Sequence, residues 1–210
     1  MSVALDSGQA SALEACVADG GVAVIPTDTV YGVCCDPDNE RAAEALYRLK
    51  RRSPARACAV MFFAVEAALR ALAELRPRER LVLETLLPGP VTVLLPNRKL
   101  RFAPACRADP ASFGLRVPRL GERLAALRSV ALPVMQSSAN ISGDPDARAF
   151  AEVPSSILER AQLALDGGEL PGTPSTVIDL RDFDREGRWH VLRDGALPRS
   201  AVEDVFASLT

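Results

Sequence analysis

The chain has 210 residues and a net charge of −2, with 48% hydrophobic and 25% charged residues, an ordinary composition for a globular protein. Its longest apolar runs are far shorter than the roughly 20 residues that span a membrane, and the acidic charge argues against non-specific coating of nucleic acid. A single histidine and five cysteines without a CxxC pair argue against a structural zinc site. The first residues, MSVALDSGQA, lack the features of a signal peptide, so we expect a cytoplasmic protein without a membrane partner.

The first half of the chain predicts alternating helices and strands. Residues 8–19 have helical periodicity and precede a short apolar strand at 22–25. A polar turn at 27–29 follows, and Asp38 or Asn39 caps a second helix. The later predicted elements of this half are a buried strand at 57–63, helices at 65–75 and 77–86, and a strand at 91–95.

The second half continues this alternation with longer loops. Residues 97–112 have no periodicity and predict a surface loop, and a Gly- and Pro-rich loop at 167–174 is expected to move as a lid. The other predicted elements are strands at 113–117, 132–136, 163–166, 176–180 and 190–193, and helices at 119–127, 155–160 and 201–209. Without repeats or a linker, this pattern predicts a single α/β (or α+β) domain over residues 1–210, with a twisted mixed sheet flanked by helices.

Several common catalytic motifs are missing from the sequence. It contains neither a GxxxxGK[ST] phosphate loop nor a GxGxxG dinucleotide motif. His190 lies in a predicted strand, where it is more typical of a structural residue than of a catalytic base. A site in this chain must therefore be built from hydroxyls, amides and cations.

Polar residues of these types gather at four places. Two are hydroxyl-rich segments directly after predicted strands, at 26–32 and 137–143, where α/β proteins tend to bind ligands. Lys50 and Arg52 form the third, since two cations could straddle a polyphosphate. The fourth is Arg116, which lies within a strand and needs an anionic partner, together with the hydroxyls that open the strand at 176–180. Each also has a structural explanation: hydroxyls can cap helices, cations suit a helix C-terminus, and Arg116 can belong to an internal ion pair.

Seven segments occur in an order that matches one family. They are PTDTVYGVCCDP at 26–37, LYRLKRR at 46–52, LPGPVTVLLP at 87–96, GLRVP at 114–118, SSANISGDP at 137–145, STVIDL at 175–180 and LRDGAL at 192–197. With these segments the chain resembles the YrdC-type L-threonylcarbamoyladenylate synthases. The resemblance covers residues 20–197 and implies a YrdC-like domain whose concave, twisted sheet forms a basic cleft.

The resemblance also implies a reaction and its partners. L-Threonine, bicarbonate and ATP would give threonylcarbamoyl-AMP and pyrophosphate, with Mg²⁺ accompanying the ATP. The product would serve the threonylcarbamoyladenosine modification of tRNA, so tRNA or a tRNA-modifying transferase complex is an implied partner.

Site residues follow from the resemblance, position by position. The implied ATP contacts are Lys50, Arg52, Arg56, Thr92, Ser138, Asn140 and Arg193, with Lys50 and Arg52 as the catalytic cations. The implied threonine contacts are Thr29, Met61, Arg116 and Ser175, and Arg116 would take the carboxylate. No metal ligand from the protein is expected.

Met61 departs from the family pattern. The synthases carry a histidine at this point of the strand after the Lys-x-Arg motif, whereas a methionine resembles the related carbamoyltransferase domains. Formation of carbamoyl-adenylate from carbamoyl phosphate is therefore the alternative activity, unless Met61 simply packs. A non-catalytic RNA-binding module is a further alternative, although aromatic residues, at 5%, offer few platforms for stacking bases.

Overall fold

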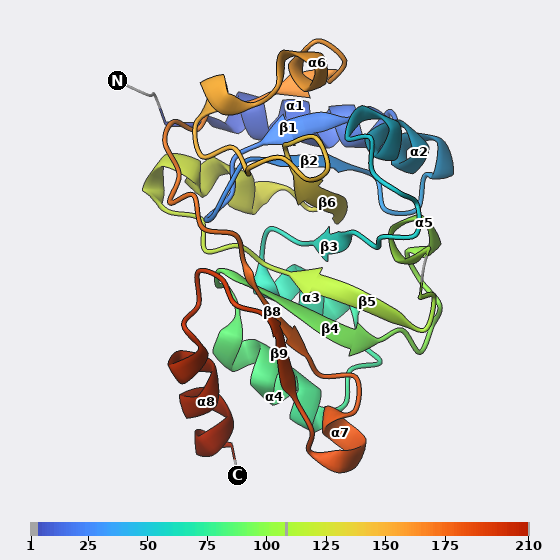
Figure 1. The fold of residues 1–210 in the computed structure, drawn as a ribbon, viewed down its shortest axis with the longest axis vertical. Helices are drawn as coiled ribbons and strands as arrows, with labels where there is room; N and C mark the ends of the chain where they lie inside the picture. Colours follow the sequence, from blue (N-terminus) through green and yellow to red (C-terminus); the bar gives the residue numbers. More distant parts are fainter. Residues whose placement is uncertain (1–3, 108, 210) are drawn as a thin grey trace.

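The computed structural model describes residues 4–107 and 109–209 and contains a nine-stranded sheet (Figure 1). The strands are β1 (Ala23–Ile25), β2 (Gly32–Cys35), β3 (Ala59–Met61), β4 (Val91–Pro96), β5 (Ser112–Arg116), β6 (Val134–Ser138), β7 (Leu163–Ala164), β8 (Thr176–Asp179) and β9 (His190–Arg193). Their order is β7-β1-β2-β6-β3-β5-β4-β8-β9, and three of the eight pairings are parallel. The predicted mixed sheet is confirmed, while the predicted domain also takes in residues 1–3, 108 and 210, which lie outside the described residues.

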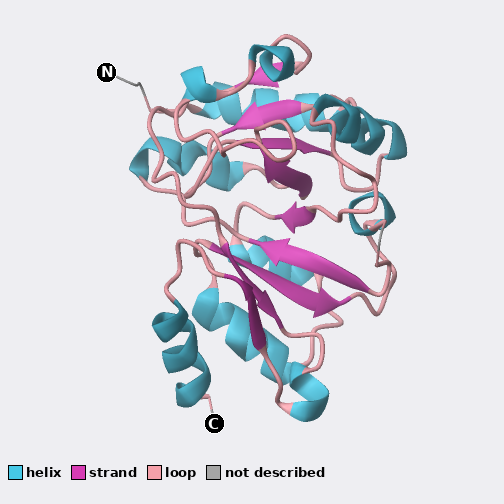
Figure 2. Ribbon diagram, viewed as in Figure 1, coloured by secondary structure: helices cyan, strands magenta, loops and turns pink. Residues whose placement is uncertain are grey.

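Helices pack along the sheet and at both of its ends (Figure 2). They are α1 (Ser7–Ala18), α2 (Glu40–Leu49), α3 (Val65–Ala71), α4 (Pro77–Leu86), α5 (Ala103–Cys106), α6 (Ser155–Leu158), α7 (Phe183–Glu186), α8 (Arg199–Ser208) and the 3₁₀ helices η1 (Glu122–Ser129) and η2 (Phe150–Glu152). At one end α1 contacts β1 and β7 and α2 contacts β2, whereas at the other α4 contacts α7 and α8. Within residues 4–107 and 109–209, no helix has the length and apolarity needed to cross a membrane.

Helix α2 shows how the sequence directs the chain toward the centre of the sheet. Asn39 caps its N-terminus by accepting a hydrogen bond from the Ala42 N–H at 3.1 Å. Leu46 and the other apolar residues of one face are buried, while the charged face is exposed. After its C-terminus Arg51 adopts a positive φ of 49°, and the next residue, Arg52, lines a cavity over the sheet.

Three local predictions were wrong. Strand β2 was not predicted, because Gly32-Val33-Cys34-Cys35 is a short run with weak strand propensity, and pairing with β1 and β6 decides its conformation. The helix predicted at 119–127 is a 3₁₀ helix that starts after Gly121, with the Leu124 N–H bonded to the Gly121 carbonyl at 2.9 Å. The predicted loop at 97–112 contains the short helix α5 and includes residue 108, outside the described residues.

Asn97 orders that loop. It is buried, its Nδ2 donates to the carbonyls of Arg101 and Pro110 at 2.8 and 3.0 Å, and its Oδ1 accepts from the Arg101 N–H at 2.9 Å. The Asn97 side chain thus forms hydrogen bonds with backbone groups near the start and near the end of the loop between β4 and β5.

Candidate functional site

A cavity of about 270 Å³ lies over the middle of the sheet. One row of the strand register forms part of its floor, because Gln136, Ala59, Gly114 and Leu94 are successive partners across β6, β3, β5 and β4 and all line the cavity. The two central positions of the row carry the smallest side chains, which leaves the sheet hollowed there. At Gly114 an added Cβ would lie 3.2 Å from Thr92 Cγ2, so a larger residue would push on the cavity wall.

Three arginines and hydroxyl groups give the cavity its chemistry. Arg52, Arg116 and Arg193 line it together with one carboxylate, that of Asp146. The hydroxyl residues of the lining are Thr92, Ser137, Ser138 and Ser175. This mixture suits an anion that also carries hydrogen-bonding groups.

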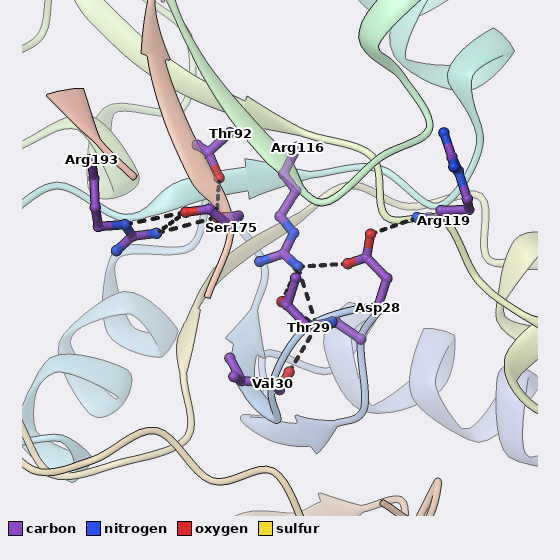
Figure 3. Close-up of polar contacts among 9 residues, drawn as sticks. Asp28, Thr29, Val30, Thr92, Arg116, Arg119, Ser175 and Arg193 are labelled. Atoms are coloured by element: carbon purple, nitrogen blue, oxygen red, sulfur yellow. Dashed lines mark hydrogen bonds and ion pairs between the residues drawn. The ribbon is translucent and has the colours of Figure 1, made fainter. Parts of the chain in front are cut away.

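Arg116 is fixed by a network on the turn after β1 (Figure 3). Its Nη2 donates to Asp28 Oδ1 at 2.7 Å, to Thr29 Oγ1 at 2.5 Å and to Thr27 Oγ1 at 3.2 Å. Asp28 is held in turn by the Arg119 N–H at 2.9 Å. The Nε of Arg116 is buried without a partner among the described residues, which leaves a donor that a ligand or a water molecule can satisfy.

A second network joins β4, β8 and β9. Thr92 Oγ1 lies 2.9 Å from Ser175 Oγ, and Arg193 Nη2 donates to the Ser175 carbonyl at 2.7 Å, as Figure 3 shows. Burial lowers the pKa of Arg193, the charge of Asp146 opposes this shift, and the charge of Arg116 adds to it. The guanidinium remains charged at any physiological pH and gives this wall of the cavity a fixed positive charge.

Lys50 lies directly behind the cavity and is almost fully buried, at 1% exposure. Its Nζ donates to the Ser138 carbonyl, to the Asn140 carbonyl at 2.7 Å and to Asn140 Oδ1 at 2.9 Å. Asn140 Oδ1 also accepts from Ser138 Oγ at 2.7 Å. Lys50 therefore donates all three of its N–H bonds to the end of β6 and the residues after it, and fixes the conformation of Ser138 and Asn140.

Arg52 bridges the loop between α2 and β3. Its Nη2 donates to the Ala57 carbonyl at 2.8 Å and its Nε to the Arg56 carbonyl at 3.3 Å, which aligns the guanidinium along the cavity wall. The side chain of Arg56 is exposed and is not part of the lining.

The cavity brings together six of the residues singled out in the sequence: Arg52, Thr92, Arg116, Ser138, Ser175 and Arg193. Thr29, Lys50 and Asn140 form a supporting layer that hydrogen-bonds to lining residues. Met61 is buried and lies beside Arg116 as its register partner across β3 and β5, without lining the cavity.

Among the lining residues with polar or ionisable side chains, sequence reasoning missed Asp146, Gln136 and Cys58. Gln136 carries a detectable signal, since it is a polar residue in an otherwise apolar predicted strand and lies on the same strand face as Ser138.

This fold and site define an α/β protein with an arginine-lined cavity whose chemistry suits a small polar anion. The family model that matches residues 15–195 is that of the Sua5, YciO and YrdC proteins, with the description "Telomere recombination". The chain therefore belongs to the Sua5/YciO/YrdC family, as the sequence motifs predicted.

Two curated relatives carry the same enzyme name. A Mus musculus protein named threonylcarbamoyl-AMP synthase is 31% identical over 199 residues, covering 90% of this chain and 69% of the mouse protein. A protein of the same name from Chromohalobacter salexigens is 35% identical over 167 residues, covering 77% of this chain and 87% of the relative. Relatives with this name occur in mammals, bacteria and archaea, so the chain is an enzyme of this family type.

Solved structures agree on the fold. The crystal structure of P. abyssi Sua5 complexed with L-threonine matches 96% of this chain with a TM-score of 0.83 and 27% identity. The chain spans only 58% of the length of that protein. E. coli YciO matches with a TM-score of 0.77, covering 92% of both chains at 22% identity, which supports the fold alone.

Proposed function

We propose that this protein joins L-threonine, bicarbonate and ATP into threonylcarbamoyl-AMP and pyrophosphate, the activated intermediate for modifying tRNA with threonylcarbamoyladenosine. One observation carries the proposal: Arg52, Arg116 and Arg193 surround one cavity together with Ser138, Thr92 and Ser175. In this proposal the triphosphate lies against Arg52, Arg193 and Ser138. The threonine carboxylate lies against Arg116, beside Thr29.

The charges of the reactants explain why the site needs cations. The nucleophile is a carboxylate oxygen of N-carboxylated threonine, which attacks the α-phosphorus of ATP. A new P–O bond forms there while the bond to the departing pyrophosphate breaks, and both partners are anionic throughout. Arginines fixed in a cavity offset this repulsion and stabilise the charge of the leaving group. The attacking oxygen is already deprotonated, so the step needs no general base.

Mg²⁺ would enter with the phosphates of ATP. Across the described parts of the chain, no group of three or more His, Cys, Asp or Glu side chains could hold a metal ion. The protein would then supply at most two such ligands, and the phosphates and water would supply the rest, which is common for this ion. Bound Mg²⁺ would neutralise phosphate charge.

Met61 supports one alternative. Because this uncharged side chain is the register partner of Arg116, it borders the proposed amino-acid position, where the synthases are expected to carry a histidine. Carbamoyl phosphate would then be the acyl source, with the same ATP contacts; carbamoyl-adenylate would be the product, and phosphate and pyrophosphate would be released.

Pyrophosphate release tests the proposal. The purified protein is given ATP, Mg²⁺ and bicarbonate with or without L-threonine, and in parallel with carbamoyl phosphate. Release that depends on threonine is the expected result, whereas release that depends on carbamoyl phosphate would replace the substrate assignment with the alternative. Binding of structured RNA that ATP does not compete away, without any release, would favour a non-catalytic RNA-binding module.

Arg52→Ala is expected to lower this turnover at least tenfold, because a cation that stabilises transition-state charge typically contributes 10²-fold or more. Arg48→Ala is the matched control, since Arg48 lies four residues earlier, pairs with Glu44 and has a 70% exposed side chain. Equal activity of both variants would rule out the ATP contact of Arg52.

In the cell, we propose that the protein acts in the cytoplasm and passes its product to a separate tRNA-modifying transferase.

A further inference from the structure

Asp146 is a carboxylate in a cavity otherwise suited to anions. It lies in the segment after β6, eight residues beyond Ser138, and its side chain is half-buried at the cavity wall. Among the described residues that line this cavity, it is the only Asp or Glu. It makes no hydrogen bond or ion pair with any other described residue, in contrast to Asp28, which contacts Arg116 directly.

The charge of Asp146 acts on two cations, Lys50 and Arg193, which lie in different parts of the chain. It raises the pKa of Lys50 behind Ser138 and that of Arg193 on β9, against the larger lowering by burial in each case. Asp146 lines the same cavity as Ser138 and Arg193, which is where the proposed function puts the phosphates. A carboxylate that served only to balance a cation would be expected in direct contact with it, and Asp146 contacts neither.

A free carboxylate at this place would repel a triphosphate. A divalent cation between the two removes the repulsion, and Mg²⁺ in nucleotide sites is typically held by one or two carboxylates together with substrate phosphates and water. Asp146 offers the oxygen donor that this ion prefers, at the cavity where the phosphates would lie.

We propose that Asp146 is the protein ligand for the Mg²⁺ ion that accompanies ATP. This assignment rests on the proposed function, and it adds a metal contact that the motifs of the sequence did not indicate. With this ligand the cavity binds Mg-ATP in preference to free ATP, because the Asp146 carboxylate attracts the bound Mg²⁺ and repels the phosphates of metal-free ATP.

The test measures ATP affinity by titration calorimetry, once in excess Mg²⁺ and once in EDTA, for the wild type and Asp146→Asn. The asparagine keeps the size of the side chain and removes its charge. With Mg²⁺ we expect the variant to bind ATP about tenfold more weakly, the loss typical of a weakened metal site. In EDTA we expect it to bind ATP about fivefold more tightly, because a like-charge repulsion of about 1 kcal/mol is gone.

Asp144→Asn is the matched control. Asp144 lies in the same segment, its side chain is exposed and has no partner among the described residues, and the substitution changes the net charge equally. We expect its affinities to match the wild type in both conditions. A thermal melt of each variant checks that the fold is kept.

The opposite signs of the two changes are the result that supports the assignment. An equal loss of affinity with and without Mg²⁺ would overturn it and assign Asp146 to a hydroxyl of the nucleotide. Unchanged affinity in both conditions would also overturn it, and either result leaves the ATP site intact. If the wild type binds ATP in neither condition, the proposed function itself is wrong and the metal assignment falls with it.

Discussion

Lys50 is deeply buried, and each N–H bond of its charged ammonium group has an acceptor. We therefore expect the structure around Lys50 to depend on its protonation and so on pH. Burial, and after it the charge of Arg52, lower its pKa from the usual 10.5 to about 8, while Cys58 and Asp146 oppose the shift. Above this pH the neutral amine has two N–H bonds for three acceptors, and the segment at Ser138 and Asn140 loses one anchor.

We therefore expect ATP affinity to fall as pH rises through about 8. The contribution of Lys50 to the free energy of unfolding changes in the opposite direction. Between about pH 8 and 10.5 the unfolded chain binds more protons than the folded one, so this contribution rises with pH. Titrations between pH 6.5 and 9.5 check the first expectation. Lys50→Met should bind weakly at every pH, and a wild-type pH profile in this variant would contradict the assignment to Lys50.

Asp28 matters because of the residue it positions. It pairs with the buried Arg116 at 2.7 Å and leaves that guanidinium at the cavity edge. In Asp28→Asn the Arg116 guanidinium loses its only ionic partner among the described residues, and its orientation becomes less fixed. We expect the KM for threonine to rise about tenfold with little change in the KM for ATP, because misplacement of a binding group acts on the substrate it orients.

Steady-state kinetics with each substrate varied in turn provide the test for Asp28. Asp38→Asn, at an exposed position with the same charge change, should behave as the wild type. Equal increases in both KM values would show a structural defect instead of a threonine-specific one.

The roles of these residues could be predicted only in part from the sequence. Their residue types and places in predicted elements indicated Arg52, Arg116, Ser138 and Ser175, and the family resemblance added Thr92 and Arg193. The orientation of Lys50 could not be predicted, since its acceptors lie 88 and 90 residues further along the chain. Asp146 carries no local signal, because a single aspartate in a loop is ordinary.

At the scale of elements, an ion pair joins the start of α4 to the end of β4. Glu79 is fully buried, and Arg98 donates to both of its carboxylate oxygens at 2.8 Å. The Arg76 N–H supplies a further bond to Glu79 at 3.0 Å, so the carboxylate also caps the helix.

Arg98→Met leaves the buried carboxylate without its ionic partner. We expect a loss of about 3 kcal/mol in the free energy of unfolding, measured by urea denaturation at pH 7. The double variant Glu79→Gln/Arg98→Met should recover part of this loss, because no charge stays buried. Arg80→Met, which breaks the exposed pair with Glu84 on the same helix, is expected to cost less than about 1 kcal/mol. Similar costs for the two arginines would contradict the structural role of the buried pair.

Elements with strong periodicity were predicted well, and short ones were not. The helix predicted at 77–86 coincides with α4, because Pro77 fixes its start and the buried Val82, Leu83 and Leu86 share one face. Strand β2 depends on two partner strands for its hydrogen bonds, and η1 depends on packing against α1. Such elements follow from tertiary contacts that local sequence does not contain.

For the molecule as a whole, the cavity joins two groups of strands. Arg52 and Ser138 come from the side of β3 and β6, whereas Thr92, Ser175 and Arg193 come from the side of β4, β8 and β9. A nucleotide bound between them binds the folded chain alone and so stabilises both sides together.

Mg-ATP at about a hundred times its Kd should raise the melting temperature by about 5–10 °C, since it adds about 2.7 kcal/mol to stability. Arg193→Met should lose this shift, because it removes one wall of the anion site. Arg188→Met is the control, at an exposed arginine whose partners Asp182 and Glu186 lie away from the cavity. Differential scanning fluorimetry gives all the values, and a shift kept in Arg193→Met would place the nucleotide elsewhere.

The position of β8 and β9 in the sequence also bears on how the protein is made. Thr92 meets Ser175 across 83 residues, and Arg193 comes later still, so the last strands to be synthesised complete a wall of the cavity. Distant strand pairings of this kind form slowly, after the local helices. A nascent chain on the ribosome can thus fold much of its sheet while it still lacks Ser175 and Arg193. In the proposed function, the complete nucleotide site forms only after β9 has left the ribosome and paired with β8, so full protection of the chain against proteolysis by a nucleotide begins at that point.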